Sequence, residues 1–349
     1  MSQPGDPSGP VEEVIRLLES AAGPVNPMVL LVGPPLSGIT RSMYEAVRSG
    51  LPHGRLYQLT VADLAARPDL EDLFSGIGPH VLWLDGLAPA DLVLLGHGVL
   101  DQVLPHAMVL ASVDAFWCDR VLRDGSAAIA PARTVLLEYA DRIPVPFTLS
   151  PRERSRLREM GYPVSKGLAE SLVGGENLIK HYRRGARSHP EGHRLVQAAI
   201  DARRCGIHRP FSEDELQRLW EARGGSPGAF QRALDWASAV PEGSTTGLLF
   251  RAHGGQSEDW RVLGYAAGAD NGDHGHKARR LSDDAWKQAR ELFADAADQY
   301  ALGIAAHLHG RDETARLALS RTVQVAPPQD PVAAAAAGAL RSLEAEGSV

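Results

Sequence analysis

Residues 33–40 read GPPLSGIT and lie between an apolar run, MVLLV (28–32), and a segment with helical character. They follow the phosphate-loop pattern G-x-x-x-x-G-K-[ST] at Gly33, Gly38 and Thr40, but Ile39 occupies the lysine position. In such a loop, backbone N–H groups and a helix N-terminus face an anion, and the Ser/Thr hydroxyl binds Mg²⁺. The pattern therefore predicts a phosphate cradle that lacks its main cation.

The missing lysine has no local substitute. Arg41 follows Thr40, but on a helix it is turned about 100° from it, so its side chain should point elsewhere. Loss of a charged hydrogen-bond partner costs about 1.5–3 kcal/mol, which is about 10- to 150-fold in affinity. We expect a larger loss in hydrolysis, because charge builds on the transferring phosphoryl group. The candidate nucleotide-binding residues of the loop are Gly33, Pro34, Pro35, Ser37, Gly38, Ile39, Thr40 and Arg41.

Two further positions complete the candidate site. Asp85 ends the apolar run HVLWLD (80–85), as the acid of a Walker B strand does, and is predicted to hold Mg²⁺ together with Thr40. Gly86 follows where hydrolysing proteins usually place a second acid. The alternative for Asp85 is a helix cap at the strand end. Ser112 closes the run AMVLAS (107–112) and either senses the terminal phosphate or simply ends its strand.

The elements that must position these residues alternate between strands and helices. Apolar runs of strand length occur at 28–32, 55–60, 80–85, 107–112 and 134–139, with segments of helical length between them. This alternation predicts an α/β fold: a P-loop NTPase-like parallel sheet with helices on both faces. From about residue 149 the pattern becomes helical, and residues 246–265 alternate as a β-hairpin with HGG (253–255) near its turn.

We therefore expect four segments. They are a leader with an N-terminal helix (1–24), the degenerate P-loop domain (25–148), a mainly helical, winged-helix-like domain (149–275) and a C-terminal helical hairpin with a tail (276–349). In the last segment, 282–310 and 311–323 are the expected helices, and the alanine-rich tail is either another helix or a frayed end.

The composition argues against disulfide-rich and membrane-spanning proteins. The chain has 349 residues, a net charge of −7 and only two cysteines, Cys118 and Cys205, which excludes a disulfide framework and favours a reducing, cytoplasmic compartment. Charged residues or prolines interrupt every apolar run, so no membrane segment is expected. Neither G-x-S-x-G nor H-E-x-x-H occurs, and we assign no catalytic residue.

Two weaker patterns admit a functional interpretation, but a purely structural one is favoured for each. The pairs His274/His276 and His307/His309, with Asp273 beside the first, have metal-ligand character, but structural or solvent-facing histidines are the favoured interpretation. Residues 151–220 carry more Arg and Lys than Asp and Glu, which admits nucleic-acid binding, although a solvated helix surface is favoured.

Beyond these motifs, the sequence resembles actinobacterial ATP-binding proteins of the STAND/AAA-like P-loop class, many of which carry tetratricopeptide repeats. Their loop G-x-x-G-x-G-K-T-R aligns with residues 33–41, their strand W-L-D-D-L with WLDGL (83–87), and their A-T-x-R with ASVD (111–114). The helical segments after residue 167 also look like the region that follows the ATPase core, and residues 298–318 look like a repeat region that stops early. The departures are Ile39 for lysine, Gly86 for an acid and Asp114 for arginine.

The resemblance implies ATP and Mg²⁺ as weakly held cofactors and a signalling role with impaired hydrolysis, a pseudo-NTPase or at most a weak ATPase. The first alternative is a non-enzymatic scaffold with a relic P-loop, whose helical half contacts a protein partner. The second is nucleic-acid binding by residues 151–220. The sequence specifies no oligomeric state.

Overall fold

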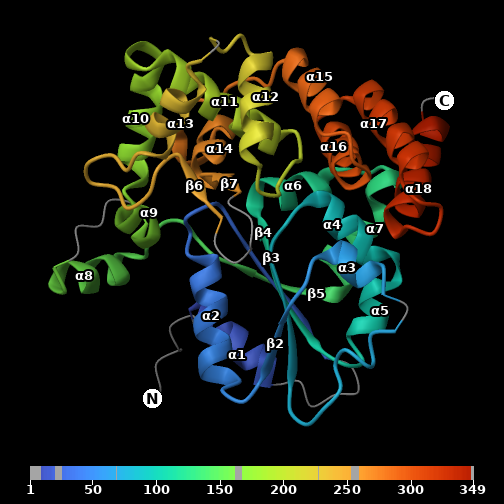
Figure 1. The fold of residues 1–349 in the computed structure, drawn as a ribbon. Helices are drawn as coiled ribbons and strands as arrows, with labels where there is room; N and C mark the ends of the chain where they lie inside the picture. The colour runs from blue at the N-terminus through green and yellow to red at the C-terminus, as the bar shows by residue number, and fades with distance from the viewer. Residues whose placement is uncertain are drawn as a thin grey trace. The chain divides into compact units, whose positions relative to one another are not determined.

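The computed structural model describes residues 9–19, 26–67, 69–161, 167–226, 228–252 and 259–346 (Figure 1). The leader (1–8) and the expected hairpin turn (253–255) lie outside these residues. The chain forms two compact units: a sheet unit of Met1–Gly33, Gly38–Pro146 and Gly310–Val349, and a helical unit of Pro34–Ser37 and Phe147–His309. The four segments expected from the sequence remain a prediction, but residues 310–349 group with the sheet.

The sheet unit contains the five-stranded parallel sheet that the sequence predicts. Its strands follow the order β2-β3-β4-β1-β5, and they are β1 (Met28–Gly33), β2 (Arg55–Gln58), β3 (His80–Leu87), β4 (Met108–Asp114) and β5 (Ala140–Pro144). In the register of β1 with β4, Leu31 pairs with Ser112 and Gly33 with Asp114. The carboxyl ends of these two central strands are therefore level.

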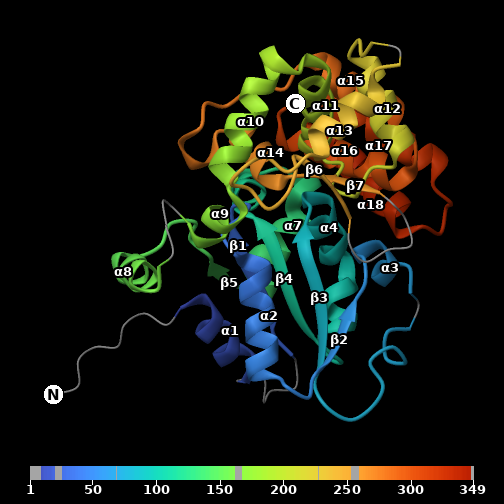
Figure 2. The same ribbon diagram turned by 60° about the vertical axis from the view of Figure 1, so that its left-hand side comes forward.

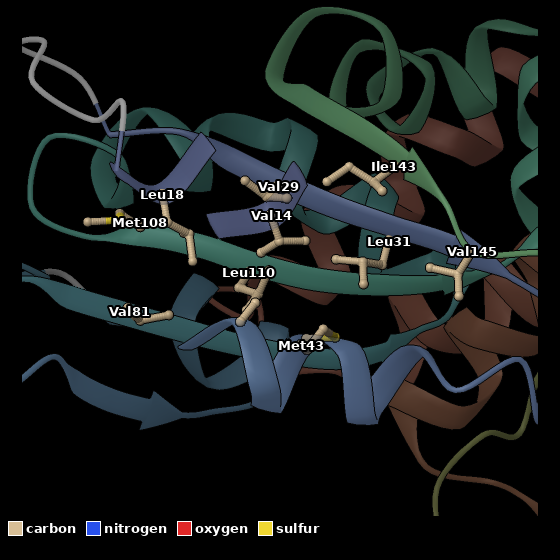
Figure 3. Close-up of a cluster of buried hydrophobic side chains, with 11 residues drawn as sticks. Val14, Leu18, Val29, Leu31, Met43, Val81, Met108, Leu110, Ile143 and Val145 are labelled. Carbon is tan, nitrogen blue, oxygen red and sulfur yellow. The ribbon is translucent and has the colours of Figure 1, made fainter. Parts of the chain in front are cut away.

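Two N-terminal helices cover one face of the sheet. They are α1 (Pro10–Glu19) and α2 (Ile39–Gly50). Figure 3 shows their core, in which side chains of both helices pack on alternate residues of the strands, among them Val29 and Leu31 of β1. Alternation along a strand sends Leu30 to the opposite face, where it is also buried. Burial on both faces explains why the strands read as continuous apolar runs.

The opposite face is covered by helices from the middle and the C-terminal part of the chain. α6 packs on β1 and β4 and also contacts α4 and α7, while α18 packs on α4, η2 and α17 (Figure 1). The remaining bounds in this unit are α3 (Val61–Ala65), α4 (Pro89–Leu94), π-helix η1 (Leu95–Val99), α5 (Leu100–Val103), α6 (Ala115–Arg123), 3-10 helix η2 (Ala127–Ile129), α7 (Ala130–Thr134), π-helix η3 (Val135–Tyr139), α17 (Asp312–Val325) and α18 (Pro331–Glu346). The alanine-rich tail is thus a helix.

One expected strand is wrong. Residues 134–139 (TVLLEY) end α7 and form the π-helix η3, and the fifth strand is the next segment, Ala140–Pro144. Pro131 lies in the first turn of α7, and the helix buries Val135 and Leu136 on one side. A short apolar run fits a buried helix face as well as a strand. The strand itself is a charged edge with Asp141 and Arg142 exposed, which periodicity does not detect.

The helical unit consists mainly of helices and includes the predicted hairpin. β6 (Leu249–Arg251) and β7 (Trp260–Val262) pair antiparallel, and Phe211 bridges Trp260 on the other side of β7. The helices are α8 (Pro151–Glu159), α9 (Leu168–Val173), α10 (Gly175–Ser188), α11 (Pro190–Arg204), α12 (Glu213–Ala222), α13 (Phe230–Ser238), α14 (Gly264–Asn271), 3-10 helix η4 (Asp273–Gly275), α15 (Asp283–Leu292) and α16 (Ala296–Leu308). The long helix expected over 282–310 is two helices, because Asp295 caps a new one by accepting from Asp298 N–H.

A buried network of ion pairs joins several helices within the helical unit. Asp201 of α11 is almost fully buried and accepts hydrogen bonds from the guanidinium groups of Arg279 and Arg223. Arg279 also donates to Asp270 of α14 at 2.8 Å, and Tyr182 of α10 donates to the same carboxylate. Charge-assisted hydrogen bonds thereby join α10, α11, α14, the end of α12 and the loop that holds Arg279.

Among the described residues, no helix is long and apolar enough to span a bilayer.

Candidate functional site

The phosphate-loop segment joins β1 to α2, as expected. β1 ends at Gly33, and Gly38 is the residue immediately before α2, in a left-handed conformation with φ of 92°. Ser37 N–H donates to Pro34 O at 3.1 Å, and Ser42 N–H donates to Gly38 O at 2.9 Å, so the loop closes on itself and the helix begins at once. The first N–H groups of a helix have no acceptor within the helix. Those of Ile39 and Thr40 therefore form the anion-attracting end of α2.

Leu36 is a loop residue that the sequence reasoning did not single out. Its φ is +62°, a left-handed value that is uncommon outside glycine. In the family pattern G-x-x-G-x-G-K-T-R this position is the second glycine. The backbone thus keeps a glycine conformation although the residue is leucine, at a cost of about 1–2 kcal/mol.

The predicted metal-site residues meet at the carboxyl edge of the sheet. Thr40 Oγ1 donates to Asp85 Oδ2 at 2.8 Å, and Ser112 Oγ donates to Asp85 Oδ1 at 2.5 Å. Thr40 and Asp85 are exposed, whereas Ser112 is buried. Three residues that are far apart in sequence therefore form one hydrogen-bonded cluster beside the start of α2. In open α/β sheets, ligands bind at this edge of the strands.

The glycine in the second-acid position has a structural role. Gly86 has φ of +78° and lies where the register of β3 with β4 shifts between Leu84 and Leu87, and its N–H donates to Ser112 Oγ at 2.7 Å. A local shift of this kind re-aims the residues of a strand. Open space surrounds a side chain built at this position, but an acid there would adopt a left-handed backbone. The backbone conformation at position 86 therefore favours glycine over an acidic residue.

Ile39 and Arg41, at the start of α2, have different surroundings. Ile39, in the lysine position, packs against the hydrophobic core between α2 and the sheet (the core of Figure 3). Arg41 pairs with Glu45 at 2.5 Å, one turn along α2, and its side chain is 77% exposed. Its assignment as a nucleotide-binding residue remains a prediction, as do those of Pro34 and Pro35.

The residues present fit a phosphate and a magnesium ion. Mg²⁺ is commonly held by one or two protein oxygens together with phosphate oxygens and water. The hydroxyl of Thr40 and the carboxylate of Asp85 already lie within hydrogen-bonding distance of each other, so one ion could contact both. Ser37 lies in the part of the loop that groups with the helical unit, and its assignment as a nucleotide-binding residue remains a prediction.

Asp91 is the acid in the sheet unit with the strongest perturbation. It lies in the first turn of α4, directly after β3, and accepts Ala88 N–H at 2.8 Å. Burial raises its pKa to about 6, and the backbone hydrogen bond opposes this shift only in part. Asp114, which replaces the arginine of the family pattern, instead caps α6 by accepting Phe116 N–H at 3.0 Å. Neither acid lies in the Thr40–Asp85–Ser112 cluster.

The histidine pairs have structural surroundings. His274 stacks on Tyr265 with ring centres 5.0 Å apart, and Arg183 donates to Nδ1 of His276 at 3.2 Å. His309 contacts the ring of Trp286 edge-on. Within the part of the chain that the structure describes, no group of three or more His, Cys, Asp or Glu side chains could hold a metal ion.

Comparisons with known proteins find likenesses among solved structures only. No protein-family model and no curated protein matches this chain. A STAND (signal transduction ATPase with numerous domains) protein with a tetratricopeptide repeat sensor, PH0952 from Pyrococcus horikoshii, is 11% identical with a TM-score of 0.33, over 89% of this chain and 50% of that one. NtrX from Brucella abortus, in complex with ADP, is 14% identical with a TM-score of 0.23, over 92% of this chain and 66% of that one.

The chain thus spans about half the length of the STAND protein that it matches. At these identities and scores, the two solved structures are similar to this chain in part of their fold and lend it no function. What the sheet unit displays by itself is an α/β fold in which the start of α2 at Gly38 lies beside an acid, Asp85, and the hydroxyls of Thr40 and Ser112.

Proposed function

We propose that the chain is a nucleotide-binding regulatory or signalling module of the P-loop fold, with ATP as the expected nucleotide and with impaired hydrolysis. The observation that carries this proposal is the 2.8 Å hydrogen bond between Thr40 and Asp85, beside the glycine-initiated start of α2. A relic loop under no functional constraint has no need to keep a hydroxyl and a carboxylate in the geometry of a shared magnesium ion.

The expected defect in hydrolysis follows from the surroundings of three positions. Ile39 is packed into the core, Gly86 uses its N–H to hold Ser112, and Asp114 caps a helix. The first two positions would otherwise supply a cation for the phosphates and an acid for the attacking water. We infer a module in which bound nucleotide acts as a static ligand. The magnesium ion would neutralise phosphate charge, and the backbone of residues 38–40 would orient the phosphates.

The experiment that tests the proposal is calorimetric titration of Mg-ATP and Mg-GTP into the full chain and into Asp85→Ala, Thr40→Ala and Ile39→Lys. We expect micromolar ATP binding by the wild type, a loss of at least about tenfold in both alanine variants, and a gain of about 10- to 150-fold in Ile39→Lys. Asp119→Ala is the matched control, because Asp119 is an exposed acid on α6 whose partner is Arg123.

The alternatives give different results in the same titration. A silent wild type together with a binding Ile39→Lys variant would mean that the cradle is intact but retired, as in the scaffold alternative. Silence of both would remove the nucleotide proposal. Binding that Asp119→Ala weakens as much as Asp85→Ala does would show a general effect of charge and not a site.

Nucleic-acid binding by residues 151–220 stays a prediction, and the helix before the hairpin, which lies outside that range, adds no support for a winged-helix mode of binding. In that arrangement the helix before the hairpin carries the contacts to bases and phosphates. Here that helix is α13, and its exposed side chains include Gln231, Arg232 and Asp235, one positive and one negative charge. A neutral face of this kind does not supply the excess of positive charge that phosphate binding requires.

A further inference from the structure

Helix α10, which runs along one side of the helical unit in Figure 2, carries a row of exposed basic residues and no acid after its first turn. This row, the basic stripe, consists of Lys180, Arg183, Arg184 and Arg187. Their spacing of i, i+3, i+4 and i+7 places all four on one face of the helix. The opposite face is buried and contains Leu178, Ile179 and Tyr182. The basic stripe is therefore directed at solvent.

The basic stripe lacks the acidic partners that exposed arginines have on five other helices. In α1, α2, α6, α11 and α12, ion pairs with an acid three or four residues away are formed by Arg16, Arg41, Arg48, Arg123, Arg194 and Arg218. In α10 these spacings join like charges, which destabilise a helix. Within the described part of the chain, the stripe forms no ion pair, and Arg183 donates to Nδ1 of His276.

The acids on the surrounding elements do not cancel the charge of the stripe. Glu176, one turn before Lys180, is the only acid of α10, and four positive charges with one negative charge leave a net charge of +3. The helices α9, α11 and α14 pack on α10. Their acids Glu170, Glu191 and Asp270 each accept a hydrogen bond from another residue of the helical unit. An anionic partner is therefore the complement of this face.

Stacked aromatic rings lie at the C-terminal end of α10. The ring centre of Trp236 is 4.5 Å from that of His181 and 5.6 Å from that of His189, with interplanar angles of 21° and 17°. Glycines make room for the indole, because a Cβ atom at Gly185 or Gly192 would lie 2.4 Å or 2.3 Å from it. His189 directly follows α10 and is exposed, so its ring is accessible to a nucleobase.

We propose that the basic stripe binds single-stranded nucleic acid, with phosphates along α10 and a base stacked on His189. Proteins that bind single strands combine a row of cations along the backbone with aromatic rings on which bases stack. Three of the four cations are arginines, whose planar guanidinium matches two phosphate oxygens at once. This mode of binding uses neither the hairpin nor the nucleotide site.

A membrane surface is a poorer match for α10. Helices that lie on lipid expose an apolar face to it. No large apolar side chain is exposed on α10, because its apolar residues pack inside the helical unit.

The test is fluorescence anisotropy of a fluorescein-labelled oligothymidylate of about 16 nucleotides, titrated with the full chain at several salt concentrations. We expect a dissociation constant between about 10⁻⁶ and 10⁻⁴ M at physiological salt. The slope of log K against log salt concentration should be about −3, because each of four neutralised phosphates releases about 0.7 counterion. Lys180→Glu and Arg187→Glu should each weaken binding by at least about fivefold and make the slope shallower by about 0.7.

The matched control is Lys287→Glu, which makes the same charge change at an exposed lysine of α15, a helix that packs on α11, α12 and α16. It should change the affinity by less than about twofold, since charges beyond a Debye length are screened. His189→Ala should weaken binding by at least about fivefold with an unchanged salt slope, and His189→Phe should retain it, because stacking needs a ring and no charge.

Several results would overturn the proposal. They are an unbound oligonucleotide at low salt, and a loss of affinity in Lys287→Glu as large as that in Lys180→Glu. Unchanged affinity in His189→Ala would remove the stacked base and with it the preference for single strands. Tighter binding of a duplex of the same length, of polyglutamate or of phosphatidylserine vesicles would assign the basic stripe to another class of partner. All substituted side chains are exposed, so wild-type thermal unfolding midpoints are expected throughout.

Discussion

At the scale of single residues, Asp91 is the clearest source of pH dependence in the sheet unit. Its pKa in the folded protein is about 6, above its ordinary value of 3.8, so the folded state keeps this proton longer than the unfolded state does. The contribution of Asp91 to stability is therefore full at low pH and is lost as the pH rises from about 4 to about 6. Above that range the buried carboxylate is a constant penalty.

Asp91→Asn tests this assignment. Asparagine keeps an oxygen that can accept Ala88 N–H but carries no charge. We expect the variant and the wild type to have similar unfolding free energies near pH 4, and the variant to be more stable by about 3 kcal/mol at pH 7.5. Urea unfolding at several pH values measures the difference. A gap between the two proteins that does not change with pH would contradict a titrating Asp91.

The candidate site shows which residues a sequence pattern can place. The phosphate-loop and Walker B patterns pair Thr40 with Asp85, and their side chains are hydrogen-bonded in the structure. The pattern could not show that Ile39 turns into the core, since packing direction depends on α1 and the sheet together. Nor could it show the positive φ values of Leu36 and Gly86, which belong to the local backbone.

At the scale of elements, charge pairing contributes to the helical unit in a way that hydrophobic periodicity does not reveal. Arg279 lies in a loop, yet it links Asp201 of α11 to Asp270 of α14. Arg279→Met leaves the buried carboxylate of Asp270 without its guanidinium partner, whereas Asp201 keeps Arg223, and we expect the unfolding free energy to fall by about 3–5 kcal/mol. Arg218→Met, which removes an exposed pair with Asp214, should cost about 0–1 kcal/mol.

Denaturant unfolding of the two variants gives the comparison directly. Equal losses in Arg279→Met and Arg218→Met would mean that the buried network carries no more free energy than an exposed pair. In that case hydrophobic packing of α11, which buries Leu195, Val196 and Ile200, would be what holds these helices together.

The elements themselves were predictable where a strong period and a cap coincide. Ser150 and Ser212 each form a capping box with the acid three residues later, which is a signature of a helix start that can be read from sequence. The failure at 134–139 has a physical cause: a six-residue apolar run has no period long enough to separate a buried helix from a buried strand. The charged strand that follows is defined by its pairing with β1, a long-range interaction.

At the scale of the whole molecule, the C-terminal helix is part of the sheet unit and not an appendage. α18 packs on α4 and η2, and Glu346 accepts Ala127 N–H at 2.9 Å. Ala336 of α18 is fully buried, whereas Ala334 on the same helix is exposed. We expect Ala336→Arg to destabilise the sheet unit by roughly 2–4 kcal/mol, because a long charged side chain cannot be accommodated there.

The readout is hydrogen–deuterium exchange of α4, a helix far from Ala336 in sequence. Faster exchange of α4 in Ala336→Arg, with unchanged exchange in Ala334→Arg, is the expected result. If neither substitution alters α4, then α18 does not support the sheet unit, and its packing contributes little free energy.

Because the sheet unit is built from two separated parts of the chain, its strands are translated well before its last two helices. Residues 147–309 are translated between the five strands and the two helices that complete their outer layer. While those residues leave the ribosome, α4 and η2 do not yet have α18 beside them, and apolar surface that the finished protein covers faces solvent or a chaperone. The sheet of this protein is thus made early but finished last, and its vulnerable period lasts as long as the translation of the helical unit.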